Sequence, residues 1–266
     1  MQSQPIAAGS GGISAQGRWS SMDIADRESL RKAVGELEWY HTIDLGGGIV
    51  TPGAFDLRPV IGQLGIPDRL DGRHVLDVGP GDGFFSFLFE SRGAASVTTV
   101  ELPSWSAHDA SPVLQAFYAS EPAASRNIHD ALGLAAHALQ SKVRRTFVSI
   151  YDFDPAVHGT YDIVFCASVL LHLTDPLRAL YRIFAATKEM ALISTPIDDE
   201  ASAETRALFR GTATGHTFWL PNRACLMQWA RAAGFSRVEW VSRFELTSPP
   251  EKHGFHDTHG AIRAFR

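Results

Sequence analysis

The stretch Val75-Leu76-Asp77-Val78-Gly79-Pro80-Gly81-Asp82-Gly83 joins a short apolar run to three glycines spaced two residues apart. A buried strand that enters such a turn, and then a helix from Phe84, is the usual ligand site of an open α/β sheet. Glycines adopt positive φ and let a ligand approach the backbone closely. A dinucleotide fingerprint spaces its glycines differently, and a P-loop requires Gly-Lys-Ser/Thr, so the loop matches neither pattern. Because Asp77 would repel a pyrophosphate, we expect a ligand that carries positive charge.

Short apolar runs and amphipathic segments alternate on both sides of this loop. The expected strands, rich in apolar and β-branched residues, are 74–78, 97–101, 146–150, 162–167, 190–194, 238–246 and 261–265. The expected helices, all amphipathic, are 22–38, 57–64, 84–92, 125–140, 176–187 and 222–233. Such alternation predicts βαβ units, and hence an α/β fold whose mostly parallel sheet has helices on both faces.

Polar residues follow the next three strands as well. Glu101, before Leu102, ends the second strand, where an acid can accept hydrogen bonds from both hydroxyls of a ribose. Tyr151 and Asp152 follow the third strand, where an acid can accept from an adenine amino group. Any one such acid is also typical of a solvated strand end, so their order and spacing carry the prediction. The residues expected to bind one cofactor are Asp77, Gly79, Pro80, Gly81, Gly83, Phe84, Glu101, Leu102, Tyr151, Asp152, Ala167 and Ser168.

From Val75 to Leu173 the sequence resembles class I methyltransferases, which use S-adenosylmethionine (SAM). The resemblance implies a Rossmann-like, seven-stranded, mostly parallel sheet of strand order 3-2-1-4-5-7-6. It also implies SAM as the cofactor, and SAM carries the expected positive charge on its ammonium and sulfonium groups. Segments outside the core are similar to the group of the tRNA wobble-uridine methyltransferase: Tyr40-His41-Thr42-Ile43-Asp44-Leu45, Thr51-Pro52-Gly53, Phe55-Asp56, His172-Leu173-Thr174-Asp175-Pro176-Leu177 and Phe218-Trp219-Leu220-Pro221.

One position departs from that group. The wobble-uridine enzyme uses a carboxylated SAM, held partly by a tyrosine directly before the motif histidine, and Leu171 stands there in this chain. Leucine cannot hydrogen-bond a carboxylate, so ordinary SAM is expected. The net charge of -5 also differs from the basic excess that is typical of nucleic-acid binders.

We therefore expect a methyltransferase that acts on O, N or C of a small-molecule acceptor, with no nucleic acid or membrane as its partner. The alternatives are a tRNA-modifying methyltransferase and a SAM-binding protein without transfer activity.

Three residues are candidates for the chemistry. His172 follows the fourth strand, where the site opens, and histidine can serve as a general base near neutral pH. A structural imidazole in the loop before Asp175 explains it equally well. Tyr40 and His41 precede the core, in a segment that closes over the site in related enzymes, although a packed surface segment is the alternative.

A second histidine series consists of His253, His256 and His259. Because Gly254 and Gly260 disfavour a helix, we expect the series in the loop between the last two strands. Together with Asp198 and Asp199 it could hold a metal ion. Solvated loop histidines are the commoner arrangement, so we assign no metal.

The domain organisation follows from composition. We expect a disordered tail over 1–18, a helical cap or lid over 19–70 and the SAM-binding domain over 71–266. No apolar run is long enough to span a membrane, and two cysteines, Cys166 and Cys225, cannot build a disulfide framework. We therefore expect a cytoplasmic protein.

Overall fold

The computed structural model describes residues 19–120, 122–198, 204–252 and 254–266. The expected tail over 1–18 lies outside the described residues, as do Asp199 and His253. The main sheet has seven strands: β1 (His74–Val78), β2 (Ser96–Glu101), β3 (Arg144–Phe147), β4 (Tyr161–Ala167), β5 (Thr187–Pro196), β8 (Arg237–Thr247) and β9 (His256–Phe265).

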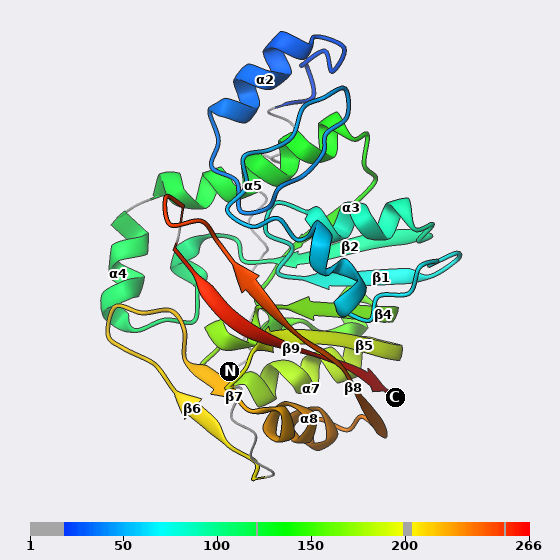
Figure 1. Cartoon of the computed structure of the whole chain (residues 1–266), viewed down its shortest axis with the longest axis vertical. Helices are drawn as coiled ribbons and strands as arrows, with labels where there is room; N and C mark the ends of the chain where they lie inside the picture. The colour runs from blue at the N-terminus through cyan, green and yellow to red at the C-terminus, as the bar shows by residue number, and fades with distance from the viewer. Residues whose placement is uncertain (1–18, 121, 199–203, 253) are drawn as a thin grey trace, which may run out of the picture.

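These strands lie in the order β3-β2-β1-β4-β5-β9-β8 (Figure 1). The first five pair in parallel, and β9 pairs antiparallel with both β5 and β8. Two further strands, β6 (Ala207–Phe209) and β7 (Trp219–Pro221), form a separate antiparallel pair that the sequence did not predict. When the seven strands of the main sheet are numbered without β6 and β7, β8 becomes the sixth strand and β9 the seventh, and the order is 3-2-1-4-5-7-6. The predicted fold class is therefore confirmed.

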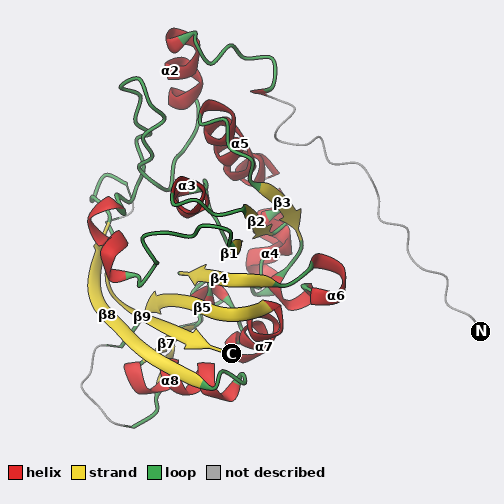
Figure 2. Ribbon diagram, turned by 90° about the vertical axis from the view of Figure 1, so that its right-hand side faces the viewer, coloured by secondary structure: helices red, strands yellow, loops and turns green. Residues whose placement is uncertain are grey.

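Helices cover both faces of the sheet (Figure 2). Helices α3 (Phe84–Ser91) and α5 (Pro122–Ala138) lie on one face, and α7 (Pro176–Ala186) and α8 (Arg223–Ala232) lie on the other. The remaining elements are short helices: α2 (Arg27–Gly35), α4 (Pro112–Ser120), α6 (Pro155–His158), η1 (Arg58–Gln63), η2 (Trp105–Ala107), η3 (Ile150–Asp152) and η4 (Leu170–His172).

Local sequence signals explain where the covering helices begin. Asp175 caps α7 by accepting a hydrogen bond from the Arg178 N–H at 2.9 Å, and Asn222 caps α8 by accepting from Cys225 N–H at 2.9 Å. Gly83 precedes α3 with a φ of 95°, and a Cβ there would lie 2.7 Å from the Phe87 ring. Only glycine therefore fits at the start of α3.

Apolar side chains fill both faces of the sheet. On one face, Phe85 and Phe89 of α3 pack on Phe165 of β4, with ring centroids 4.6 and 5.2 Å apart. On the other, Leu180 and Ile183 of α7 are fully buried. Each fully buried side chain of this kind stabilises the fold by about 1.5–3 kcal/mol. Burial on both faces explains why the central strands read as continuous apolar runs.

The segment over 19–70 is less helical than expected. Asp26 caps α2 by accepting from Glu28 N–H and Ser29 N–H, so the expected helix over 22–38 begins later, at Arg27. It also ends earlier, at Gly35. The expected helix over 57–64 is the 3₁₀ helix η1. Between them the chain is largely extended, and isolated bridges join His41 to Phe55 and Asp44 to Val50.

Two further expectations were wrong in their bounds. Strand β3 ends at Phe147, because the Ser149 side chain accepts a hydrogen bond from Tyr151 N–H and begins η3. His256 and His259 lie within β9 and not in a loop. Gly260 permits the strand rather than ending it, because a Cβ there would lie 2.5 Å from the Trp240 ring of β8.

Within the described ranges, none of the helices combines the length and the apolar composition that crossing a bilayer requires.

Candidate functional site

The glycine loop after β1 keeps its backbone open. Gly79, Gly81 and Gly83 all have positive φ, and Gly79 is exposed although it directly follows a buried strand. A Cβ on Gly79 would lie 2.5 Å from Val169 Cγ2, so a side chain there would meet the residues that follow β4. Pro80 is buried, and its carbonyl accepts a hydrogen bond from Gly83 N–H at 2.9 Å, which closes the turn. Buried Phe84 begins the helix directly after the loop.

Asp77 provides a buried carboxyl group beneath this loop. It is 1% exposed and accepts a hydrogen bond from Ser86 Oγ at 2.6 Å. Burial raises the pKa of Asp77 to about 7, and the hydrogen bond from Ser86 opposes the rise. A cation placed near this group would favour the ionised carboxylate.

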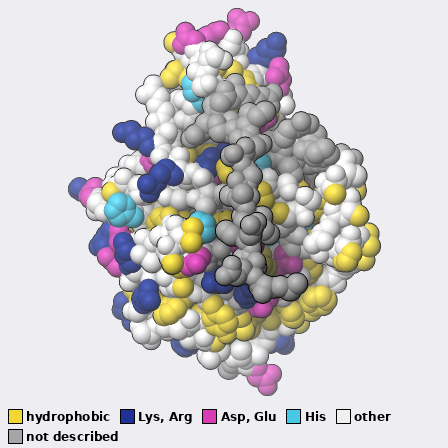
Figure 3. Space-filling view, turned by 180° about the vertical axis from the view of Figure 1, so that it is seen from behind, with side chains coloured by type: hydrophobic (Ala, Val, Ile, Leu, Met, Phe, Trp, Pro, Cys, Tyr) yellow, Lys and Arg dark blue, Asp and Glu magenta, His cyan; other side chains and the backbone are white. Residues whose placement is uncertain are grey.

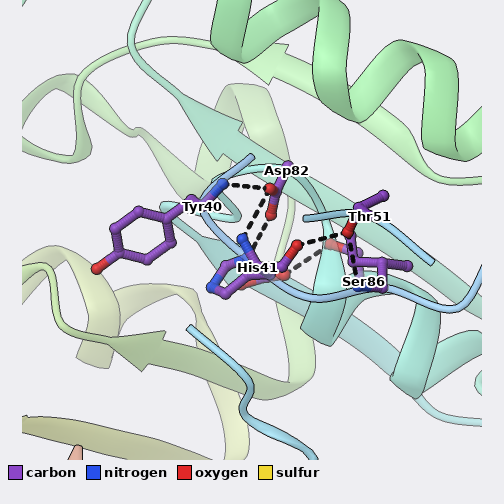
Figure 4. A network of polar contacts seen from close by, with 7 residues as sticks. Tyr40, His41, Thr51, Asp82 and Ser86 are labelled. Carbon is purple, nitrogen blue, oxygen red and sulfur yellow. Dashed lines mark hydrogen bonds and ion pairs between the residues drawn. The ribbon is translucent and has the colours of Figure 1, made fainter. Parts of the chain in front are cut away.

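Asp82, which the sequence reading left without a role, ties the N-terminal segment to the glycine loop (Figure 4). Its carboxylate is 1% exposed and accepts from Tyr40 N–H at 2.8 Å, from His41 N–H at 2.9 Å and from the His41 ring through Nδ1. The His41 carbonyl in turn accepts from Thr51 Oγ1 at 2.7 Å. His41 is therefore buried with Nδ1 occupied, and the structure gives it a structural role whether or not it takes part in the chemistry.

Tyr40 projects away from this network (Figure 4) and remains 44% exposed. The surrounding protein still withdraws its hydroxyl from bulk water, and together with the charge of Asp82 this raises the pKa of Tyr40 to about 12. Tyr40 is thus a neutral phenol at neutral pH. It can exchange hydrogen bonds with a ligand but does not act as a phenolate base.

Glu101 ends β2 on the sheet face that carries Asp77, because Asp77 lies in register with Thr99. Its carboxylate is 6% exposed and makes a two-pronged contact with Arg145 of β3. Burial alone would raise the pKa of Glu101, but hydrogen bonds from Arg145, His129 and Thr99 outweigh burial and lower it. Leu102 follows and is half-buried.

Tyr151 and Asp152 are placed differently from each other. The Tyr151 hydroxyl donates to Asp109 Oδ2 at 2.7 Å and accepts from Asp175 N–H at 2.9 Å, so it joins the loop after β2 to the start of α7. Asp152 is exposed, and one oxygen lies 3.8 Å from Arg178 Nη2 of α7. The assignment of this pair to the adenine stays a prediction.

Strand β4 ends at Ala167, and Ser168 follows with a φ of 53°. This left-handed conformation is unusual for a residue other than glycine and is often found at functional sites. The Ser168 hydroxyl lies 3.2 Å from His259 Nε2, and His259 is 2% exposed. Burial lowers the pKa of His259 to about 4, so it is a neutral, buried imidazole.

His172 lies in η4 within a group of three imidazoles. Its Nδ1 donates to the His216 carbonyl oxygen at 2.7 Å, and its ring centroid lies 5.1 Å from that of His216 and 5.8 Å from that of His108. Burial lowers the pKa of His172 to about 4, and it also lowers the pKa values of His108 and His216. The buried Nδ1 of His108 has no hydrogen-bond partner among the described residues.

The histidine series near the C-terminus does not converge. Residues three apart on a strand point to opposite faces, and accordingly His259 contacts Ser168 whereas His256 lies 3.4 Å from Glu245. No group of three or more potential ligands suited to a metal ion occurs in the part of the chain that the structure describes.

Comparisons with known proteins place the chain in a family. A family model described as a methyltransferase domain matches residues 56–239. The chain belongs to this methyltransferase family.

Curated relatives of this chain include tRNA U34 carboxymethyltransferases. That of Chromohalobacter salexigens is 29% identical over 175 residues, which are 65% of this chain and 47% of that protein. That of Pseudomonas aeruginosa is 28% identical over 187 residues, which are 69% of this chain and 51% of that protein. The chain thus spans about half the length of these relatives.

A solved structure, the N-terminal domain of EvdMO1 in the presence of SAH and D-fucose, has a TM-score of 0.59 and 17% identity. The matched region is 91% of this chain and 97% of the EvdMO1 domain. At that identity the likeness shows the fold.

The residues present fit SAM, the cofactor that the sequence leads us to expect. Asp77 would hold the cationic methionyl end, the open backbone of Gly79 would lie against the ligand, and Glu101 would accept from the ribose. When bound, SAM supplies a methyl group that a positively charged sulfur activates.

Proposed function

We propose that this methyltransferase transfers a methyl group to O, N or C of a small molecule, with His172 taking the acceptor's proton. The bond from His172 Nδ1 to the His216 carbonyl supports this role. Because a carbonyl oxygen only accepts, Nδ1 carries the hydrogen and Nε2 holds the free lone pair of a base. The lowered pKa of about 4 keeps that lone pair available at neutral pH.

A weak base is sufficient for this reaction. The sulfonium already activates the methyl group, so the protein must mainly hold the acceptor in line and exclude water. An acceptor atom becomes strongly acidic as it gains the methyl group, and a neutral imidazole can then remove its proton. In this proposal residues 71–266 bind SAM and residues 19–70 form the lid that excludes water.

A tRNA-modifying activity is the second candidate, because curated relatives carry that name. Their names weaken the expectation that no nucleic acid is bound. The net charge of -5 supports a small molecule instead, since basic side chains supply much of the affinity for phosphates. On the face shown in Figure 3, Lys and Arg form separate spots with acidic and uncharged groups between them, not one basic tract.

A labelling screen separates these candidates. SAM with an isotopically labelled methyl group is incubated with the protein and, separately, with a metabolite extract or with bulk tRNA. Protein-dependent label in small molecules is the expected result. Label in tRNA alone, lost steeply as salt rises, would establish the second candidate. Label in neither pool, with SAM bound, would favour a SAM-binding protein without transfer activity.

The role of His172 is tested on the acceptor that the screen finds. His172→Ala should lower turnover by about 10²–10⁴-fold, the usual contribution of a general base, with little change in SAM affinity. His216→Ala is the matched control, because it removes the neighbouring ring but keeps the carbonyl that orients His172. Equal losses in the two variants would contradict a catalytic role for His172.

A further inference from the structure

Ser168 carries its hydroxyl on a strained backbone at the carboxyl end of β4. Its φ of 53° lies in the left-handed region, which a residue other than glycine rarely adopts. The next residue, Val169, lies against the glycine loop, because a Cβ on Gly79 would lie 2.5 Å from Val169 Cγ2. Ser168 therefore lies at the edge of the candidate site, and it is half-buried there.

His259 of β9 determines what the Ser168 hydroxyl can do. The His259 Nδ1 donates to the Asp257 carbonyl oxygen at 3.4 Å, because a carbonyl oxygen only accepts. The hydrogen of this neutral ring is then on Nδ1, and Nε2, which lies 3.2 Å from Ser168 Oγ, accepts the hydroxyl hydrogen. Phe244 stacks on the His259 ring, with centroids 5.5 Å apart, and holds its plane. The Ser168 oxygen is left with lone pairs only, so it can accept from a ligand but not donate to one.

The direction of this contact separates the hydroxyl from the side of the sheet where SAM is expected. The sheet order is β1-β4-β5-β9, and Asp77 lies in β1 with the glycine loop directly after it. His259 lies on the other side of β4, two strands away in β9. Because the contact between Ser168 and His259 spans β5, the Ser168 hydroxyl points away from β1 and the residues expected to hold SAM.

We infer that the Ser168 hydroxyl, fixed by His259, accepts a hydrogen bond from an O–H or N–H group of the methyl acceptor. The inference rests on the proposed transfer to a small molecule, and it defines the chemistry of that molecule. A carboxylate or phosphate on the acceptor would find no hydrogen to accept at Ser168. Glu245, a charged residue that acts on His259, is acidic and would repel such an anion.

This role differs from that of His172. The free lone pair of His172 remains the one that takes the departing proton, because the lone pair of His259 is occupied by Ser168. Ser168 therefore holds a donor that the acceptor keeps, and His259 is a positioning residue that acts through Ser168.

The first experiment removes the hydroxyl without disturbing the backbone. Ser168→Gly suits a φ of 53°, since glycine adopts that region freely, so the variant should fold. The probe is the small molecule that takes up most label in the screen, isolated and titrated at saturating SAM. Its KM should rise roughly tenfold or more, because its donor is left unpaired where water is excluded, while kcat changes less than about twofold. The affinity for S-adenosylhomocysteine (SAH), measured by calorimetry, should match wild type.

Ser194→Ala is the matched control. Ser194 of β5 lies beside Ala167, and its buried hydroxyl has no hydrogen-bond partner among the described residues, so its loss should leave KM unchanged. A rise of the same size in Ser194→Ala, or an unchanged KM in Ser168→Gly, would overturn the inference while the proposed function stands. A fall in SAH affinity in Ser168→Gly would give the hydroxyl to the cofactor and overturn it as well. No labelled small molecule in the screen would overturn the proposed function, and the inference with it.

The second experiment tests whether Ser168 and His259 act as one unit. His259→Phe keeps a ring against Phe244 but offers no lone pair, whereas His259→Gln provides an oxygen that can accept from the Ser168 hydroxyl. KM should rise in His259→Phe and return towards wild type in His259→Gln. Adding Ser168→Gly to His259→Phe should raise KM no further than Ser168→Gly alone does. Additive rises, or a wild-type KM in His259→Phe together with a lower melting temperature, would overturn the inference.

Discussion

The contact between Asp82 and the N-terminal segment leads to a prediction with two separate readouts. Asp82 comes from the glycine loop and accepts three hydrogen bonds from Tyr40 and His41, which belong to the proposed lid. Asp82→Ala removes all three acceptor contacts at once. We expect the segment from Tyr40 to Phe55 to detach from the loop and SAH affinity to fall.

The structure sets the size of the effect. The carboxylate is 1% exposed and the His41 ring is buried, so water does not replace the lost contacts in the closed state. Leaving a buried donor without its hydrogen-bond partner typically costs about 1–3 kcal/mol. If the whole fold bears a cost of that size, the melting temperature falls by roughly 2–12 °C. If the segment opens locally, the loss is limited to the smaller free energy of that opening.

Hydrogen exchange distinguishes these cases. It should show lost protection in residues 40–55 of Asp82→Ala, while β1 and β4 stay protected if the opening is local. SAH affinity should fall roughly tenfold, because reordering even one loop residue costs about 1–2 kcal/mol. Asp44→Ala is the matched control, since Asp44 is exposed and accepts from Gly46 N–H within the same segment. Wild-type protection and SAH affinity in Asp82→Ala would refute the role of Asp82.

Three more predictions follow from the same site. Plain SAM should bind more tightly than carboxylated SAM in direct competition, because buried Leu171 offers no side-chain hydrogen bond; the reverse order would contradict this. Gly79→Ala should weaken SAH binding in calorimetry more than Gly72→Ala, since both positions have positive φ but only Gly79 places a Cβ against Val169. Burial raises the Asp77 pKa to about 7, so the folded state holds a proton that the unfolded state has lost, and its stability falls as pH rises towards and through 7. Asp77→Asn should therefore stabilise the free protein against urea at pH 8 by up to about 4 kcal/mol, yet weaken SAH binding; a stability difference that does not change between pH 5 and pH 8 would exclude the buried charge.

The sheet could be predicted from the sequence because its signals are local. Strand β1 has the bounds that its apolar run indicates, and α7 and α8 begin at the capping residues Asp175 and Asn222. The pair β6 and β7 was missed because each strand has only three residues. Their pairing depends on contacts with distant segments, such as the bond from Phe218 N–H to the Leu171 carbonyl at 2.7 Å. No pattern within a few residues records such a contact.

The same distinction explains what could be predicted of the site. Asp77 and Glu101 stand at strand ends in the sequence, and the structure places both on one face of the sheet. Their partners come from elsewhere: Arg145 lies 44 residues after Glu101, and Asp82 binds a segment about 41 residues earlier in the chain. His108 and His216 join His172 only through folding. Motif reading finds the acids of such a site but not the donors that occupy them.

Those donors change what the acids can do. An unpartnered glutamate at the end of β2 could turn freely towards a ligand, whereas Glu101 accepts three hydrogen bonds from Thr99 and Arg145, which fix the orientation of its carboxylate. A solvated aspartate at the end of β1 would be ionised at neutral pH, whereas buried Asp77 becomes fully ionised only above about pH 7 or beside a cation. If Asp77 holds the cationic end of SAM, that end would supply the charge, and the group that recognises the cofactor would also be one that the cofactor ionises. A buried acid of this kind favours a ligand with positive charge over a neutral ligand of the same shape.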